Sequence, residues 1–251
     1  MIRSRVKGLA AAATLGVAAL WAGFLLCDGQ AVPGGAGEHG KDGAPVVKIT
    51  DPANGGTYRW NSLVSYNAVV TYQGKSTQYQ EIPSNEVLLR ATSVPDVLAG
   101  EAGAVAAPTP PGLVEIVRLK CEGCHEFRAK SMGPSFAAIA ARYPDSQASI
   151  DTLSRSIRDG STGVWGPGSM PPHTDLTEEQ LHAMAVWMVK EAGNPSVHYY
   201  VGTDGAIRME APATPGPDAG MILTASYAAP VSAGDHEPGP RGEDTVVLHG
   251  K

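Results

Sequence analysis

The chain has 251 residues, of which 43% are apolar and 18% are charged, and its formal net charge is −6 at pH 7. These proportions are typical of a globular protein and exclude a chain that is disordered throughout. Its only concentration of basic residues is Arg3, Arg5 and Lys7. A nucleic-acid partner is therefore excluded, because phosphate binding needs a basic surface. The length suits one large domain or two to three small ones.

An export signal is predicted at the N-terminus. The three basic residues precede an uncharged run over 8–27 that is rich in Ala and Leu, a pattern that directs a chain across a membrane. Residues 1–28 are either a signal sequence that is cut off or an uncleaved membrane anchor, and lipidation of Cys27 is a third alternative. We expect a periplasmic or otherwise extracytoplasmic protein that residues 8–27 anchor to the inner membrane.

The composition and the spacing of apolar residues divide the rest of the chain into linkers, two β-rich segments and a helical segment. Residues 29–44 and 99–112 are linkers of small and turn-forming residues. Between them lies a β-rich segment, 45–98, and a second one, 194–251, ends the chain. Each is small for a core of its own, so the two either complete one sandwich or pack separately on the helical segment, 113–193. Short strands are predicted at 46–50, 64–72, 86–92, 197–201, 206–209, 220–228 and 245–249.

Cys121, Cys124 and His125 form the motif C-x-x-C-H, which is typical of covalent haem attachment. Two thiols at this spacing add to the two vinyl groups of haem, and the adjacent imidazole becomes the proximal ligand of the iron. A zinc site would need two more good ligands, and the only other cysteine, Cys27, lies in the export segment. A redox dithiol would need a βαβ context, which is absent. We therefore predict one covalent haem c.

Met170 is the predicted second axial ligand. It precedes Pro171 and Pro172, which restrict the backbone, and a His/Met pair suits electron transfer because both axial positions are filled. His173 is the rival ligand, but the two prolines turn it away. Met132 follows the proximal histidine too closely to reach the other face of the haem.

Residues 112–192 resemble a class I c-type cytochrome, the monohaem type that includes the small bacterial electron carriers. The matching motifs are Cys121–His125, Gly133-Pro134-Ser135-Phe136, Ile157-x-x-Gly160, Gly163-Val164-Trp165-Gly166, Met170-Pro171-Pro172 and a final helix with Trp187. The resemblance implies that the Pro134 carbonyl accepts the Nδ1–H of His125, and that the indole N–H of Trp165 reaches a haem propionate. Ser156 stands where the family often has an arginine that also reaches a propionate, and the neighbouring Arg155 points elsewhere on a helix.

The final helix has a clear predicted start. The run from Thr177 to Gln180 has the sequence of a capping box, and an apolar stripe at helical spacing follows it. The resemblance implies that this helix crosses the first one, Leu113–Lys120, with Trp187 at the contact.

The β-rich segments are similar to Ig/PKD-like segments that flank cytochrome modules in exported proteins. The expected fold class is therefore multidomain α + β. It consists of an all-α class I cytochrome c domain, flanking antiparallel β-sandwich-like segments and an N-terminal membrane or signal helix.

We expect an electron-transfer protein rather than an enzyme, because no cluster of catalytic acids, bases or nucleophiles accompanies the two axial ligands. Its expected partners are redox proteins, as donor and acceptor, within a multi-subunit membrane or periplasmic complex. Two alternatives stay open. One is a haem enzyme or sensor, such as a peroxidase, in which Met170 leaves the iron. The other is a docking or structural module with an accessory haem.

Overall fold

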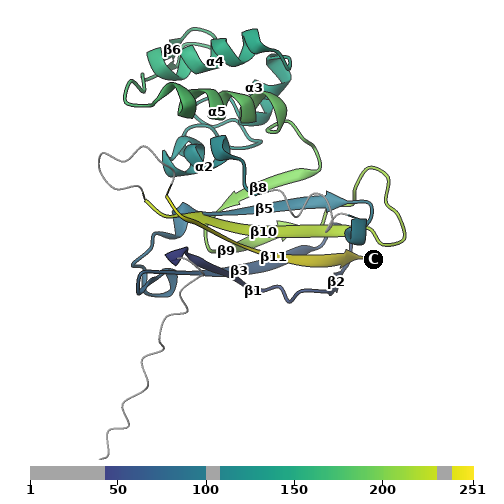
Figure 1. Cartoon of the computed structure of the whole chain (residues 1–251). Helices are drawn as coiled ribbons and strands as arrows, with labels where there is room; N and C mark the ends of the chain where they lie inside the picture. Colours follow the sequence, from purple (N-terminus) through teal and green to yellow (C-terminus); the bar gives the residue numbers. More distant parts are fainter. Residues whose placement is uncertain (1–42, 100–107, 231–238) are drawn as a thin grey trace, which may run out of the picture. The chain divides into compact units, whose positions relative to one another are not determined.

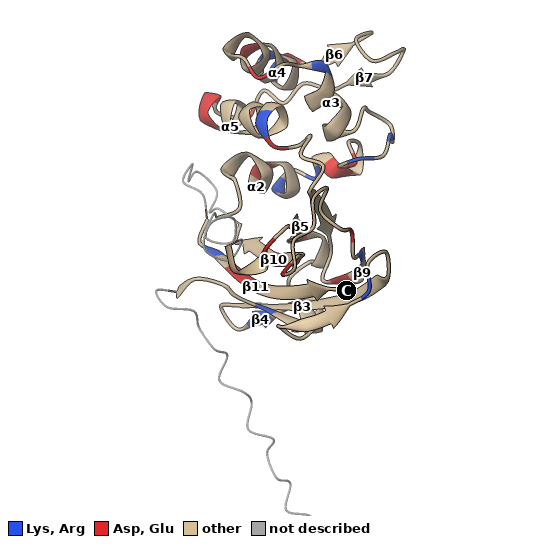
Figure 2. Ribbon diagram, turned by 90° about the vertical axis from the view of Figure 1, so that its right-hand side faces the viewer, with Lys and Arg blue, Asp and Glu red and all other residues tan. Residues whose placement is uncertain are grey.

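The computed structural model describes residues 43–99, 108–230 and 239–251 (Figure 1). All of them belong to one compact unit, Gly37–Lys251. Within it, two β-sheets share one hydrophobic core, and helices form a second core that also contacts one of the sheets. Charged residues of both signs occur along the described helices and along the described strands (Figure 2).

The first sheet is built around one long central strand. Strand β3 (Leu63–Tyr72) pairs antiparallel with β1 (Val46–Asp51), β4 (Lys75–Ser76) and β9 (Asp204–Arg208). Along β3 the side chains alternate between exposed and buried, as expected of a strand with one face on a core and the other in solvent. Strand β9 comes from the C-terminal β-rich segment, so both β-rich segments contribute to this sheet.

The second sheet has the order β2 (Gly56–Tyr58), β11 (Arg241–Gly250), β10 (Gly220–Ala228), β5 (Val87–Val94) and β8 (Val197–Val201). Neighbours are antiparallel except for the parallel pair of β2 and β11. Strand β10 is buried on both faces over nearly its whole length, which explains its almost continuous apolar sequence.

The helical part contains α2 (Pro111–Arg118), α3 (Phe136–Arg142), α4 (Gln147–Asp159) and α5 (Glu178–Lys190). The predicted capping box is present at the start of α5, with Gln180 as its third residue. Helices α2 and α5 pack so closely that a Cβ placed on Gly112 would lie only 2.0 Å from the Ala183 carbonyl oxygen. Trp187 lies on α5 and is buried in the helical core.

The helices contact the second sheet through apolar side chains. Leu88 of β5 belongs to the helical core, and Tyr199 and Val201 of β8 pack against it. Figure 1 shows the helices on the side of β5 and β8, with β1, β3 and β9 on the other side of the second sheet. The face of β5 and β8 that points away from the first sheet is thus covered by helices.

The expected fold class is wrong in two respects. The described residues form one compact unit instead of separate domains, because each β-rich segment supplies strands that pair with strands of the other. The cytochrome-like part is not all-α, since β6 (Ser161–Thr162) pairs with β7 (Ser169–Met170) inside it. The membrane or signal helix expected in residues 1–28 lies outside the described residues. Among those that are described, no helix is both long and apolar enough to cross a bilayer.

Candidate haem site

One turn of helix presents Cys121, Cys124 and His125 together. A 3-10 helix, Cys121–Gly123, begins after Lys120, which has a left-handed backbone with φ of 59°. The amides of Cys124 and His125 both donate to the Cys121 carbonyl, at 3.1 and 2.9 Å. Residues three and four apart on a helical turn lie on the same side, so the two thiols and the imidazole are placed close together.

The two thiols have different surroundings. Cys121 is half-buried and packs against the helical core, whereas Cys124 is exposed, and the two are not joined by a disulfide. Burial, assisted by the neighbouring Glu122 carboxylate, raises the pKa of the Cys121 thiol to about 12. Cys121 is therefore a neutral thiol at physiological pH, and it is a weaker nucleophile than a thiol with an ordinary pKa.

The orientation of the His125 ring is set by the loop that follows it. Its Nδ1 lies 2.8 Å from the Pro134 carbonyl oxygen, so Nδ1–H donates this hydrogen bond and Nε2 is the nitrogen that could bind a metal. Gly133 lies flat against the ring, because a Cβ placed there would be 2.4 Å from Cε1. The Gly133 amide also donates to the Cys124 carbonyl at 2.9 Å, which ties this loop to the motif itself.

Met170 lies on a short and well-restrained segment. In β7 it pairs with Ser161 of β6, and its side chain is half-buried against the helical core. Gly160, with φ of 80°, lets the end of α4 approach, since a Cβ there would be 2.8 Å from the Met170 carbonyl oxygen. Beyond the two prolines, the His173 amide donates to the carbonyls of Ile157 and Arg158 at the end of α4.

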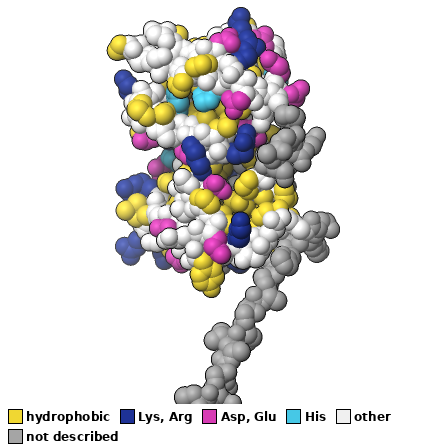
Figure 3. All heavy atoms as spheres, turned by 90° about the vertical axis from the view of Figure 1, so that its left-hand side faces the viewer, with side chains coloured by type: hydrophobic (Ala, Val, Ile, Leu, Met, Phe, Trp, Pro, Cys, Tyr) yellow, Lys and Arg dark blue, Asp and Glu magenta, His cyan; other side chains and the backbone are white. Residues whose placement is uncertain are grey.

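Trp165 is partly exposed and is held by an arginine that the sequence did not single out. The Arg142 guanidinium lies 4.6 Å from the centre of the Trp165 ring, and its Nη1 donates to the Val164 carbonyl at 3.0 Å. Arg142 ends α3, and no motif in the sequence indicates that it returns to the tryptophan loop. Figure 3 shows a face of the helical part where hydrophobic side chains and histidines lie side by side.

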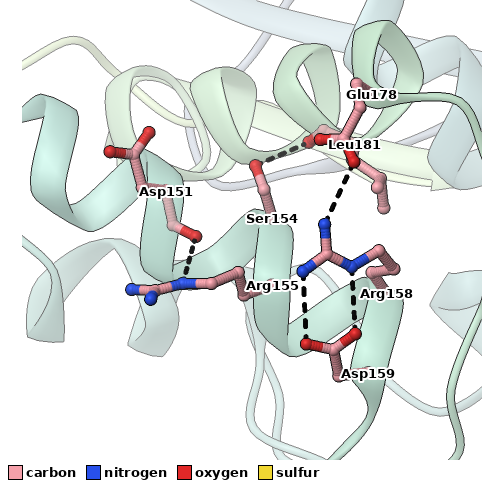
Figure 4. Close-up of polar contacts among 7 residues, drawn as sticks. All are labelled: Asp151, Ser154, Arg155, Arg158, Asp159, Glu178 and Leu181. Atoms are coloured by element: carbon pink, nitrogen blue, oxygen red, sulfur yellow. Dashed lines mark hydrogen bonds and ion pairs between the residues drawn. The ribbon is translucent and has the colours of Figure 1, made fainter.

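The arginines of α4 point to other partners. Arg155 donates from Nε to the Asp151 carbonyl of its own helix at 3.3 Å (Figure 4). Arg158 bonds to both carboxylate oxygens of Asp159 and reaches Glu178 of α5 at 3.0 Å. This pairing lowers the pKa of the Asp159 carboxyl. Both guanidiniums are thus engaged on α4 and α5.

Aromatic rings behind His125 connect it to the sandwich. The Phe136 ring lies 5.8 Å from the His125 ring and 5.3 Å from Trp187. Tyr199 of β8 lies 5.6 Å from Trp187 and 5.1 Å from Phe127, and edge-on or tilted rings at these distances attract one another. Tyr199 was missed at the sequence level, because it is distant in the sequence and belongs to a strand.

These residues suit a haem. The two thiols are adjacent, one imidazole nitrogen is free, and a thioether is mounted on a restrained strand. An aromatic and aliphatic core lies behind them. Thiols bond to the vinyl groups, imidazole and thioether are the usual axial donors to iron, and apolar walls exclude water.

Comparison with known proteins gives matches to the helical part. The family described as Cytochrome C oxidase, cbb3-type, subunit III matches residues 111–188. Cytochrome c-551 of Stutzerimonas stutzeri is 39% identical over 69 residues, which are 28% of this chain and 65% of that protein. Cytochrome c-552 of Hydrogenobacter thermophilus is 35% identical over 69 residues, or 28% of this chain and 69% of that protein.

Two further matches cover a similar share of the chain. Cytochrome c-551 of Ectopseudomonas mendocina is 39% identical over 69 residues, covering 28% of this chain and 83% of that protein. The crystal structure of wild-type Nitrosomonas europaea cytochrome c552 has 33% sequence identity and a TM-score of 0.29, and the match covers 30% of this chain and 93% of that one. The chain belongs to the family of c-type cytochromes, and its cofactor is one covalently bound haem c.

Proposed function

We propose that this protein carries single electrons in the periplasm through one haem c. Cys121 and Cys124 hold the haem covalently, and His125 and Met170 are the axial ligands of its iron. The orientation of His125 carries the proposal, because the 2.8 Å contact from Nδ1 to the Pro134 carbonyl oxygen leaves Nε2 as the donor atom.

Haem, when bound, supplies an iron that gains or loses one electron. The chain's own residues hold the two proposed iron ligands in fixed positions. Pro134 and Gly133 hold the imidazole in one orientation, and a hydrogen bond to Nδ1–H makes the imidazole a stronger donor. Met170 is restrained by β6, Gly160 and the end of α4, so the chain would hold its thioether sulfur in a fixed position as a ligand of the haem iron.

The expected partners are redox proteins that act as donor and acceptor. The match to a family described as a subunit of an oxidase supports a role within a complex. The net charge of −6 favours a partner with a basic docking surface. The export segment that supports a periplasmic location falls in residues 1–28.

The optical spectrum of the full holoprotein tests this proposal. We expect a low-spin spectrum with a Met–Fe(III) charge-transfer band at the red edge, lost in Met170→Ala and kept in Met132→Ala. Met132 is a matched control, because it is a methionine of the same chain whose side chain is 76% exposed. A high-spin ferric spectrum in the unmodified protein would contradict the ligation and would favour a haem enzyme or sensor.

A further inference from the structure

We propose that Arg128 is a positioning residue for His125, and that through it the β-sandwich becomes part of the haem site. This inference rests on the proposed role of His125 as an iron ligand. Arg128 lies three residues after His125, in the loop that leads to Gly133 and Pro134. Figure 3 shows basic side chains at the level where the helices meet the sandwich.

Arg128 fastens this loop to the start of β8. Its Nη2 donates to the carbonyl oxygens of Asn194 and Val197, at 2.5 and 2.7 Å. Hydrogen bonds from a charged guanidinium are stronger than those between neutral groups. A guanidinium is also planar, so it holds two carbonyls in a defined arrangement that a flexible ammonium does not impose.

The anchored loop is continuous with the contacts that orient the imidazole. The carbonyls of Glu126 and Phe127 accept the amides of Phe136 and Ala137 at 3.1 and 3.0 Å, so the loop before Pro134 is bonded to the start of α3, which follows Pro134. Next to Arg128, the Phe127 ring packs 5.1 Å from the Tyr199 ring of β8. The loop is therefore held to the same strand by a polar and an aromatic contact.

A second cation holds the other end of the haem-attachment motif. Lys120 directly precedes Cys121, and its Nζ donates to the carbonyl and side-chain oxygens of Asn85 at 2.7 and 3.3 Å. Asn85 lies in the 3-10 helix Ser84–Glu86, immediately before β5. Strands β5 and β8 are paired neighbours, so the two cations hold the motif at neighbouring points of one sheet, Lys120 just before β5 and Arg128 at the start of β8.

It follows that the sandwich limits the movement of the loop that presents the Pro134 carbonyl to His125. If the Arg128 bonds are lost, the loop moves more freely and the Nδ1–H bond opens more often. The imidazole then becomes a weaker donor, and the balance between ferric and ferrous iron shifts toward ferrous.

The variant Arg128→Met tests this in the full holoprotein, because methionine keeps an apolar stem but has no donor. We expect hydrogen exchange at His125 Nδ1 to accelerate about tenfold and the ferric-to-ferrous ratio at a fixed ambient potential to fall about threefold. Arg128→Lys is expected to recover part of both changes. Lys130→Met, which changes an exposed cation of the same loop, is the matched control and should leave both values unchanged.

A purely structural role for Arg128 predicts a different result. In that case Arg128→Met lowers the denaturation midpoint while the exchange rate and the ferric-to-ferrous ratio stay as in the unmodified protein, and this outcome overturns the proposal. If the ferric protein lacks the methionine band, the proposed ligation by Met170 fails, whereas exchange at His125 Nδ1 still reports on Arg128.

Amide hydrogen exchange of the unmodified protein is an independent test, available even if a variant does not mature. The amides of Gly133, Phe136 and Ala137 should open together with those of β8, with the same dependence on denaturant. Opening of these amides in a separate and easier step contradicts the coupling.

Discussion

Substitution of Gly133 by alanine should displace the imidazole of His125. The added Cβ would lie 2.4 Å from Cε1 and 2.7 Å from Nδ1, whereas ordinary contacts begin at 3.4 Å. The ring must therefore retreat by about 1 Å, or the loop must move away by the same amount. Either movement lengthens the 2.8 Å contact between Nδ1 and the Pro134 carbonyl oxygen beyond hydrogen-bonding range.

Loss of this bond should raise the reduction potential of the haem. Removal of such a partner commonly weakens metal binding by about tenfold or more. Ferric iron depends most on a strong donor, and a tenfold preferential loss from that state equals about 59 mV for one electron. Redox titration of Gly133→Ala should therefore show an increase of roughly 60 mV.

Gly123→Ala is the matched control for this experiment. A Cβ at Gly123 meets nothing within 4 Å, although the residue lies inside the attachment motif. Its potential should equal that of the unmodified protein. If Gly133→Ala also keeps the original potential and the same His125 Nδ1–H resonance, then the contact with Pro134 does not control the iron, and the reasoning is refuted.

Three further predictions concern stability. Gly112→Ala should cost about 1–3 kcal/mol, seen as a lower urea midpoint than in Gly123→Ala, because its Cβ would overlap the backbone of α5. Burial raises the pKa of Tyr66 to about 12, so the folded state keeps a proton that the unfolded state loses above pH 10. About 2–3 kcal/mol of stability, complete below pH 10, should then disappear as the pH rises to 12, and Tyr66→Phe should flatten this decline in denaturant titrations. Thr177→Ala should cost about 1 kcal/mol, because the Thr177 hydroxyl caps the Gln180 amide at the start of α5; a midpoint equal to that of the unmodified protein would contradict it.

The elements that the sequence predicts well are those with local causes. The start of α5 follows from the capping box at Thr177, and the strand predicted at 220–228 has the same bounds as β10. Both signals involve residues that are near one another in the chain. The C-x-x-C-H motif is local in the same sense, which explains why the cofactor could be predicted from Cys121, Cys124 and His125 alone.

Contacts between distant segments could not be predicted in this way. Nothing near Arg128 in the sequence indicates that it bonds to Asn194 and Val197, and nothing near Arg142 indicates its position over Trp165. Arginine on an exposed loop is usually solvated, so its sequence carries no sign of a tertiary partner. The sequence left open whether the two β-rich segments complete one sandwich or pack separately, because the pairing of β3 with β9 depends on residues that are far apart in the chain.

The chain runs from β5 into the helical part and returns at β8, and this connection explains why the helices and the two sheets form one compact unit. Strands β5 and β8 pair antiparallel, with Thr92 opposite Val197, so the chain leaves the second sheet and returns to it at the same end. The first and last helices of the insertion, α2 and α5, also pack against each other. The sheet therefore holds the two ends of the insertion close together before those helices meet, which reduces the entropy lost when they pack. Weakening the pairing of β5 and β8 should consequently destabilise the helix crossing and the haem site behind it, even though neither strand supplies a ligand.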